Sequence, residues 1–126
     1  MIVDSSALVA VAHAEPEADA FLMAMRDADV CRISAPTLLE TSMVLSPLPP
    51  DRVDALVAST GLEVVAFDHH HLVRARSAFA VYGKGSGSPA KLNFGDCMSY
   101  ALAKVTGETL LFKGDDFTHT DITPAL

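Results

Sequence analysis

Apolar residues recur along the chain in two patterns that alternate from the first residue to the last. Short runs rich in β-branched and aromatic residues, such as "LEVVAF" at 62–67, are typical of buried strands. Spacings of three and four, as in Ala18, Phe21, Leu22 and Met25, are typical of amphipathic helices. The runs predict strands at 2–3, 30–34, 62–67, 108–112 and 121–123. The spacings predict helices over 5–13, 16–28, about ten residues between 34 and 50, 50–61, 69–82 and 94–104.

Two helix starts carry capping residues. Asp68 is expected to cap the helix over 69–82, and Asn93 is expected to cap the next helix, whose first turn carries Asp96. Pro50 and Asp51 are expected to begin the helix before these two. The residues expected to face the core are Leu72, Ala75, Ala78, Phe79 and Tyr82 in the first of the capped helices, and Cys97, Ala101, Leu102 and Val105 in the second.

The alternation of strands and helices predicts the fold class. It favours an α/β protein, a three-layer α/β/α sandwich around a mostly parallel central sheet. With 126 residues and 50% hydrophobic composition, residues 1–126 are expected to form a single domain with one core. No apolar run approaches the ~20 residues of a membrane span, and no basic segment precedes the first apolar stretch, so we expect a cytoplasmic protein that does not bind membranes.

The charge balance restricts how the chain could contact nucleic acid. A net charge of −7 argues against a broad basic binding face, because phosphate affinity normally comes from clustered Lys and Arg. Any such contact is therefore expected to be local or assisted by cations. Cys31 and Cys97 have no metal-ligand spacing and are expected to be reduced core residues.

Acidic residues from distant parts of the chain are predicted to meet at one edge of the sheet. Asp4 follows the first strand, and Asp115 and Asp116 follow the strand in "LLFKGDDF". Glu40 and Asp96 are expected in the first turns of helices that should start from the same edge. Because ligands of open parallel sheets gather beyond the carboxyl ends of the strands, four acidic positions are predicted to converge there.

Such a cluster has a chemical consequence. Two carboxylates within ~4 Å repel one another by about 4 kcal/mol at an effective dielectric of 20. Proteins relieve this repulsion by protonating one group or by binding a cation. Oxygen-only ligand sets suit Mg²⁺ or Mn²⁺, which commonly contact phosphate oxygens. The sequence therefore predicts metal-dependent phosphoryl chemistry.

Each acid also has a purely structural alternative. Asp4 is placed to cap the helix that follows it. The stretch "TLLE", residues 37–40, fits a capping box, and Asp96 fits a residue that complements the helix dipole. Asp115 and Asp116 follow a glycine, which is a common turn composition. These alternatives stay open for each position taken alone.

Other polar residues near the acids are candidates for substrate contact. Ser6, two residues after the first acid, could position a phosphate, and Lys84, Lys91 and Lys113 could bind one. The alternatives are a helix N-terminal serine and ordinary surface lysines. "HHH", residues 69–71, is expected to be a solvated helical turn, because consecutive helix residues point about 100° apart and cannot all face one ion.

Four segments together resemble one family, the PIN-domain nucleases, and within it the VapC-type toxins of bacterial toxin–antitoxin pairs. The opening "MIVDSSALVA" is similar to the family's first strand and first acid, carried here by Asp4, and "SAPTLLET" to its second-acid helix, with Glu40. "AKLNFGDCMSYALAKVTG" is similar to the third-acid helix, with Asp96. "TLLFKGDDFTHTD" resembles the closing motif, in which Asp115 is the better match for the fourth acid and Asp116 is the alternative.

This resemblance implies an endoribonuclease that depends on Mg²⁺ or Mn²⁺, is a homodimer and is silenced by a cognate antitoxin protein. Asp4 and Asp96 would hold the main ion, with Glu40 and Asp115, or Asp116, completing the set. The apolar and Met character of helix 16–28 and of "TSMVL" suggests either core packing or surfaces for the dimer or the antitoxin.

Two other functions compete with this interpretation. An aspartate-dependent phosphohydrolase or phospho-accepting domain also places an Asp after its first strand, but "DSS" lacks the second Asp of a DxD motif. A PIN-fold binding module with a decayed site is the second, and the presence of all four acids argues against it.

Overall fold

Four parallel strands form the centre of the molecule. The structure is a computed structural model that describes residues 1–49 and 51–126. Within these residues the strands make one sheet in the order β3-β2-β1-β4, and all neighbouring pairs are parallel. The strands are β1 (Ile2–Val3), β2 (Arg32–Ser34), β3 (Glu63–Val65) and β4 (Leu110–Leu111). The predicted parallel sheet is therefore confirmed.

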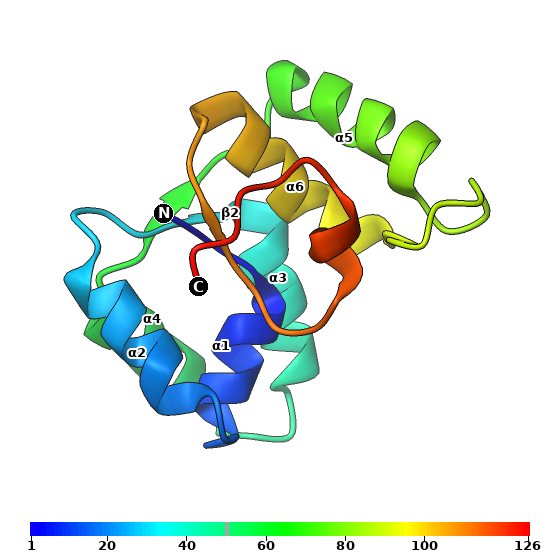
Figure 1. The fold of residues 1–126 in the computed structure, drawn as a ribbon. Helices are drawn as coiled ribbons and strands as arrows, with labels where there is room; N and C mark the ends of the chain where they lie inside the picture. Colours follow the sequence, from blue (N-terminus) through cyan, green and yellow to red (C-terminus); the bar gives the residue numbers. More distant parts are fainter. Residues whose placement is uncertain (50) are drawn as a thin grey trace.

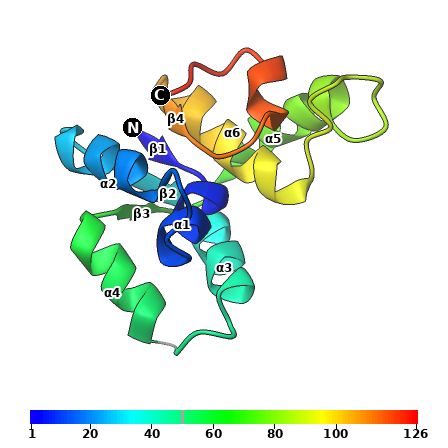
Figure 2. The same cartoon turned by 60° about the horizontal axis from the view of Figure 1, so that its bottom comes forward.

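Helices cover both faces of this sheet. They are α1 (Ser5–Ala12), α2 (Ala18–Asp27), α3 (Ala35–Val44), α4 (Asp51–Thr60), α5 (His69–Tyr82), α6 (Phe94–Thr106) and the 3₁₀ helix η1 (Asp116–His119). Figure 1 and Figure 2 show α5 and α6 on one side of the strands and α1, α2 and α4 on the other, which confirms the α/β/α fold class. Pro50, expected to begin a helix with Asp51, lies outside the described residues. No helix in the described part of the chain has the length and apolar character needed to cross a bilayer.

The two core layers follow from the alternation of side chains along the short strands. Ile2 and Leu110 pair with each other and lie in the cluster that α5 and α6 complete. Val3 and Leu111 form the next pair and lie in the opposite cluster, with side chains of α1 and α2. Because successive strand residues point to opposite faces, two residues per strand suffice to anchor both layers.

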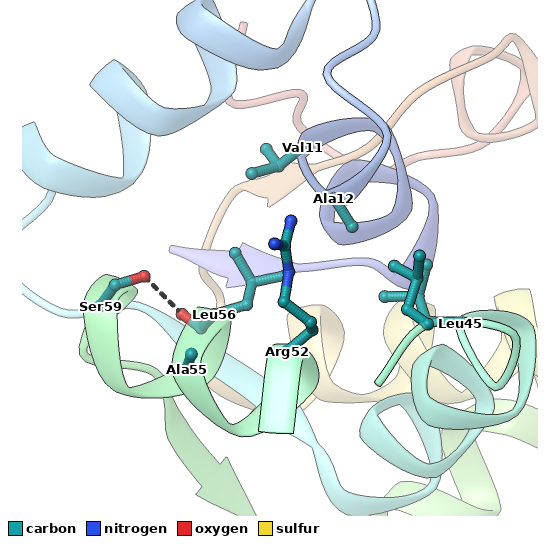
Figure 3. A pocket seen from close by; sticks show the side chains of 8 residues that line it. Val11, Ala12, Leu45, Arg52, Ala55, Leu56 and Ser59 are labelled. Carbon is teal, nitrogen blue, oxygen red and sulfur yellow. Dashed lines mark hydrogen bonds between the residues drawn. The ribbon is translucent and has the colours of Figure 1, made fainter. Parts of the chain in front are cut away.

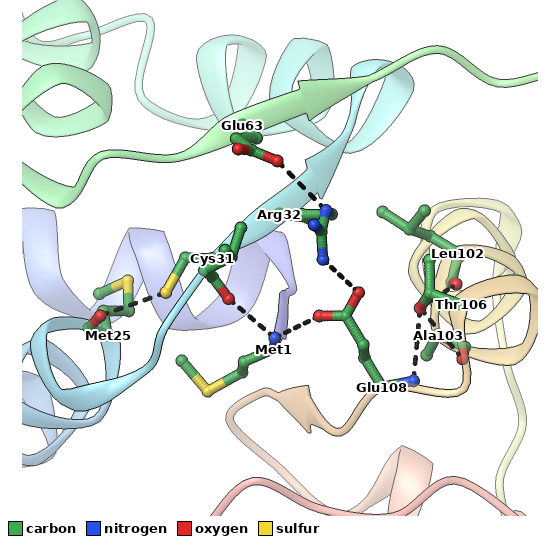
Figure 4. A network of polar contacts seen from close by, with 10 residues as sticks. Met1, Met25, Cys31, Arg32, Glu63, Leu102, Ala103, Thr106 and Glu108 are labelled. Atoms are coloured by element: carbon green, nitrogen blue, oxygen red, sulfur yellow. Dashed lines mark hydrogen bonds and ion pairs between the residues drawn. The ribbon is translucent and has the colours of Figure 1, made fainter.

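A charged network closes the amino ends of the strands (Figure 4). Arg32 Nη1 donates to Glu108 Oε1 at 2.5 Å, and Arg32 Nε pairs with Glu63 at 3.2 Å. The amino group of Met1 also contacts Glu108. Burial alone would raise the pKa of Glu108, but the hydrogen bonds and charges of Met1 and Arg32 outweigh it and hold that pKa below its usual range. The network thus fixes the register of β1, β2 and the chain entering β4.

Two predicted strands differ from the structure. The run 62–67 forms an edge strand of three residues, and Glu63 and Val64 are exposed, so the expectation of a buried strand is wrong. Within this run Leu62 is buried and Val65 is partly buried. Residues 121–123 form no strand; an isolated bridge joins Leu110 to Pro124 instead.

The expected core faces of α5 and α6 are only partly correct. Ala75 and Ala78 are buried against α6, but Leu72 and Phe79 are 43% and 50% exposed. The expectation that Val105 is buried is also wrong. Alanines bring α5 close to α6, so the larger side chains at the margins of this contact stay in solvent. His71, expected in a solvated turn, is buried, and its Nδ1 lies 2.7 Å from Asp68 Oδ1 within the cap of α5.

Candidate active site at the carboxyl edge of the sheet

Asp4 stands where β1 ends and α1 begins. Its backbone N–H donates to the carbonyl of Leu111 at 2.9 Å, which extends the β1–β4 pairing by one residue. Its Oδ2 accepts hydrogen bonds from the Ser6 N–H at 2.9 Å and the Ser6 hydroxyl at 2.6 Å, so the predicted helix cap is present. Its Oδ1 accepts from the Ser99 hydroxyl at 2.6 Å. With 3% of its surface exposed, Asp4 is a buried acid whose two oxygens are both held.

The hydroxyl of Thr37 lies beside that of Ser99. Thr37 Oγ1 of α3 lies 3.2 Å from Ser99 Oγ of α6. The predicted capping box at 37–40 is wrong, because Ser34 precedes the helix as its N-cap and Thr37 lies inside it. Glu40 is therefore in the second turn of α3, and not in the first turn as expected.

The Glu40 carboxylate reaches from α3 to the backbone of α6. A Cβ atom built on Gly95 would lie 2.5 Å from Glu40 Oε2 and 2.6 Å from Cδ, so the carboxylate lies against the glycine beside Asp96. Burial raises the pKa of Glu40, and the charge of Asp4 adds to this, while the side chain of Ser5 opposes it. The absence of a side chain at position 95 is what lets Glu40 enter the site.

Asp96 lies in the first turn of α6 and forms a capping box with Asn93. The Asp96 N–H donates to Asn93 Oδ1 at 2.9 Å, and the Asn93 N–H donates to Asp96 Oδ2 at 2.8 Å. The pKa of Asp96 is nevertheless raised to about 6, first by burial and then by the charges of Asp4, Asp116 and Glu40. The cap lowers this pKa but does not overcome the other effects. Asp96 thus does cap its helix, as the structural alternative predicts, but this role does not explain its raised pKa.

The closing loop distinguishes the two adjacent aspartates. Asp116 begins η1, and its charge is one of those that raise the pKa of Asp96. Asp115 precedes η1 as its N-cap, and its backbone carbonyl accepts from the Thr118 N–H at 3.0 Å and hydroxyl at 2.5 Å. Both carboxylates are exposed. The structure therefore brings Asp4, Glu40, Asp96 and Asp116 into one electrostatic neighbourhood.

Two of the predicted substrate contacts, Ser6 and Lys113, have partners of their own. The Ser6 hydroxyl donates to Asp4 and accepts from the Lys113 N–H at 3.0 Å, which ties the closing loop to the first acid. The ammonium of Lys113 contacts Glu15 and lies 3.1 Å from Glu17, and these contacts raise its pKa. Lys84 is exposed in the loop after α5.

Three residues of the site were not predicted from the sequence: Thr37, Gly95 and Ser99. A signal for two of them was present. Thr37 precedes Glu40 by three residues and Ser99 follows Asp96 by three, so each shares a helix face with an acid. Gly95 stands beside Asp96, but only the position of α3 shows why it must be glycine.

The donor set fits a hard divalent cation. Carboxylates offer only oxygen ligands, which suit such an ion. Burial and then the charges of the neighbouring acids raise the pKa of Asp96, and a bound cation would lower it. Within residues 1–49 and 51–126, no three His, Cys, Asp or Glu side chains stand in positions to ligate one ion together. Of the four carboxylates, those of Asp4 and Asp96 accept hydrogen bonds from neighbouring groups.

Comparison with known proteins identifies the family. The family model described as PIN domain matches residues 1–122. The chain belongs to the PIN-domain family. It is 46% identical to Ribonuclease VapC42 of Mycobacterium tuberculosis over 129 residues, covering 99% of this chain and 98% of that one.

Two further relatives come from the same organism. Ribonuclease VapC28 is 44% identical, with 100% of this chain and 98% of the relative covered, and Ribonuclease VapC30 is 41% identical, with 97% and 95% covered. The resemblance inferred from the four acidic segments is confirmed. Membership of this PIN-domain family also removes the alternative of a phospho-accepting domain.

Proposed function

We propose that this PIN-domain chain is a metal-dependent endoribonuclease that acts as the toxin of a toxin–antitoxin pair, with residues 1–126 as its single nuclease domain. The observation that carries the proposal is the convergence of acids from four segments: Asp96 has its pKa raised first by burial and then by the charges of Asp4, Asp116 and Glu40. The ribonuclease names of relatives that align over nearly the whole chain support the choice of RNA as substrate. An RNA substrate places the activity in the cytoplasm.

Each acid has a role in this proposal. Asp4 and Asp96 would hold the main ion, Mg²⁺ or Mn²⁺, and Glu40 and Asp116 would complete the set directly or through water. Asp116 is preferred to Asp115 because its charge acts on Asp96. The ion, when bound, supplies charge neutralisation at the scissile phosphate and a more acidic water.

The remaining steps belong to the chain itself. Asp4 is kept in one orientation by the hydroxyls of Ser6 and Ser99. Asp96, with a pKa of about 6, is mostly ionised near neutral pH, so it can accept a cation there without first losing a proton. Since water attacks the phosphate and the ribose 2′-hydroxyl does not, we expect products with 5′-phosphate and 3′-hydroxyl ends.

RNA binding to this acidic protein requires a local basic surface. Between Asp68 and Asp96 the chain contains no Asp or Glu, and it carries Arg74, Arg76, Lys84 and Lys91. This segment comprises α5 and the loop that leads into the first turn of α6, where Asp96 lies. The acid-free segment is therefore the part of the chain best suited to hold phosphates next to the acids. Lys84 is a better candidate for a phosphate contact than Lys113, because the ammonium of Lys113 forms ion pairs with two glutamates.

Two protein partners are proposed, each with its own surface. Leu39 and Met43 of α3 are 63% and 67% exposed, and we assign this apolar strip to the homodimer contact. A groove of about 290 Å³ between α1 and α4 is assigned to an antitoxin segment (Figure 3). Its lining is mostly apolar, and Arg52 projects into it, so an apolar side chain next to a carboxylate would fit.

The test is direct cleavage of RNA by the purified chain. The parent protein is incubated with a mixed-sequence single-stranded RNA and Mg²⁺ or Mn²⁺, alongside the Asp4→Asn and Asp96→Asn variants. We expect cleavage by the parent only, with 5′-phosphate ends and complete loss in EDTA. Equal cleavage by either variant and the parent would refute the assignment of the acids. A parent that binds RNA but never cleaves it under these conditions would instead favour the decayed binding module.

A further inference from the structure

We propose that the Thr37 and Ser99 hydroxyls form a buried relay that positions Asp4 and sets the register of the three elements that carry acids. This inference rests on the proposed function, because it assigns a purpose to residues that do not contact substrate. Thr37 and Ser99 are positioning residues in this proposal. They act through the orientation of Asp4.

The direction of the relay follows from counting protons. A carboxylate only accepts, so the single hydroxyl proton of Ser99 points to Asp4 Oδ1 at 2.6 Å. The Ser99 oxygen is then free only to accept, and the Thr37 hydroxyl at 3.2 Å is the donor. The chain runs from Thr37 through Ser99 to Asp4. Its last bond, at 2.6 Å, is the shorter of the two.

Burial shows that these hydroxyls have a specific use. Thr37 and Ser99 are both 0% exposed. A buried hydroxyl without a partner costs roughly 1 to 3 kcal/mol, so a purely apolar contact between α3 and α6 would be better served by valine and alanine. The two hydroxyls are tolerated because each has the other or Asp4 as a partner.

The relay joins the parts of the chain that carry the acids. Asp4 follows β1, Thr37 lies one helical turn before Glu40 in α3, and Ser99 lies one turn after Asp96 in α6. Residues three apart share a helix face, so fixing Thr37 and Ser99 against Asp4 also fixes the distance of the two helical acids from it. Ser6 holds the opposite oxygen of Asp4 and connects to the Lys113 backbone of the closing loop. Asp4 is thus the common point of a network that reaches all four acidic segments.

Paired substitutions at Thr37 separate hydrogen bonding from packing. Thr37→Val keeps the shape and removes the hydroxyl, whereas Thr37→Ser keeps the hydroxyl and removes a methyl group. Thr41, the next buried threonine of α3, supplies the matched control, because its hydroxyl donates to the Thr37 backbone carbonyl at 2.9 Å and to no acid. Ser99→Ala removes the central hydroxyl.

The primary measurement is Mn²⁺ affinity, by titration of the RNA-free protein with MnCl₂ and calorimetric or paramagnetic detection. We expect Ser99→Ala and Thr37→Val to weaken Mn²⁺ binding by about 10-fold or more, as the loss of outer-shell partners commonly does. Thr37→Ser and Thr41→Val should stay within about threefold of the parent. Thermal unfolding of each apo variant identifies any that lose the fold.

Double substitution provides a further criterion. Since Thr37 acts only through Ser99, Thr37→Val added to Ser99→Ala should cause no further loss of Mn²⁺ affinity. Parent-like binding by Thr37→Val together with weakened binding by Thr37→Ser would overturn the relay and leave a packing role. If the expected Mn²⁺ pattern appears but the parent never cleaves RNA, the relay stands and the proposed nuclease function fails.

Discussion

The contact between Glu40 and Gly95 leads to a prediction about a single added methyl group. Gly95→Ala places a Cβ atom 2.5 Å from Glu40 Oε2 and 2.6 Å from Cδ. Ordinary van der Waals contact begins near 3.4 Å, so the carboxylate must retreat by about 1 Å. The backbone of α6 does not resist the change at this position in its first turn, because alanine has a higher helix propensity than glycine.

The expected consequence is a loss of activity without a loss of folding. Glu40 ends in a flexible carboxylate, so its displacement costs little stability, and the gain in helix propensity offsets part of that cost. A displacement of about 1 Å in a catalytic group can lower the rate on the order of 100-fold. We therefore expect RNA cleavage to fall about 100-fold, while the melting temperature stays within a few degrees of the parent value.

The assay compares four proteins: the parent, Gly95→Ala, Glu40→Asp and the double variant. Glu40→Asp shortens the side chain by one methylene and makes room for the new methyl group. Gly95→Ala should therefore be strongly harmful alone and nearly neutral when added to Glu40→Asp. Cleavage by Gly95→Ala at the parent rate would refute the role given to Glu40, and unfolding of Gly95→Ala would refute the view that the contact affects only the carboxylate.

Three further predictions concern the charges of the protein. Because the pKa of Asp96 is raised to about 6 in the folded state, the stability of the metal-free protein should fall as pH rises from about 3.8 to 6. Asp96→Asn should therefore raise the free energy of unfolding at pH 7 by about 1 to 2 kcal/mol, after allowance for solvent screening. This gain should be absent near pH 4. Glu108→Gln, at the opposite edge of the sheet, should lower the free energy of unfolding by roughly 1 kcal/mol at pH 7 and leave cleavage unchanged. In denaturation curves, the difference in stability between this variant and the parent should vanish as pH falls below 4.5 and through the lowered pKa of Glu108. Asp116→Asn should reduce cleavage about 10-fold or more and Asp115→Asn less than about threefold, and the reverse order in parallel rate measurements would assign the fourth position to Asp115.

The sequence was sufficient for the parts of the fold that depend on local patterns. The order of strands and helices, the caps at Asp68 and Asn93, and the position of Asp4 after β1 are all set by residues close together in the chain. Errors arose where long-range packing decides. The edge position of β3 and the exposure of Phe79 depend on which neighbours cover them, and a single sequence does not specify this.

The site shows the same division. That the acids lie near one another could be predicted, because the rule about strand ends needs only their order in the chain. The hydroxyl relay and the glycine contact could not be found, because both depend on how α3 lies against α6. Likewise, the choice between Asp115 and Asp116 depends on how η1 turns after the glycine at 114, where the backbone has a φ of +100°.

The capping and catalytic interpretations of these acids support each other. Asp4 accepts an N–H at the start of α1, and Asp96 accepts one at the start of α6. The amino end of a helix favours negative charge, so these two carboxylates have favourable partners before any cation binds. The same caps fix where the carboxylates stand, since a capping side chain has little freedom to turn away. The folded chain can therefore keep mutually repelling acids together at the edge of its sheet. Burial and the remaining repulsion both raise the pKa of Asp96, and a divalent ion would relieve the repulsion.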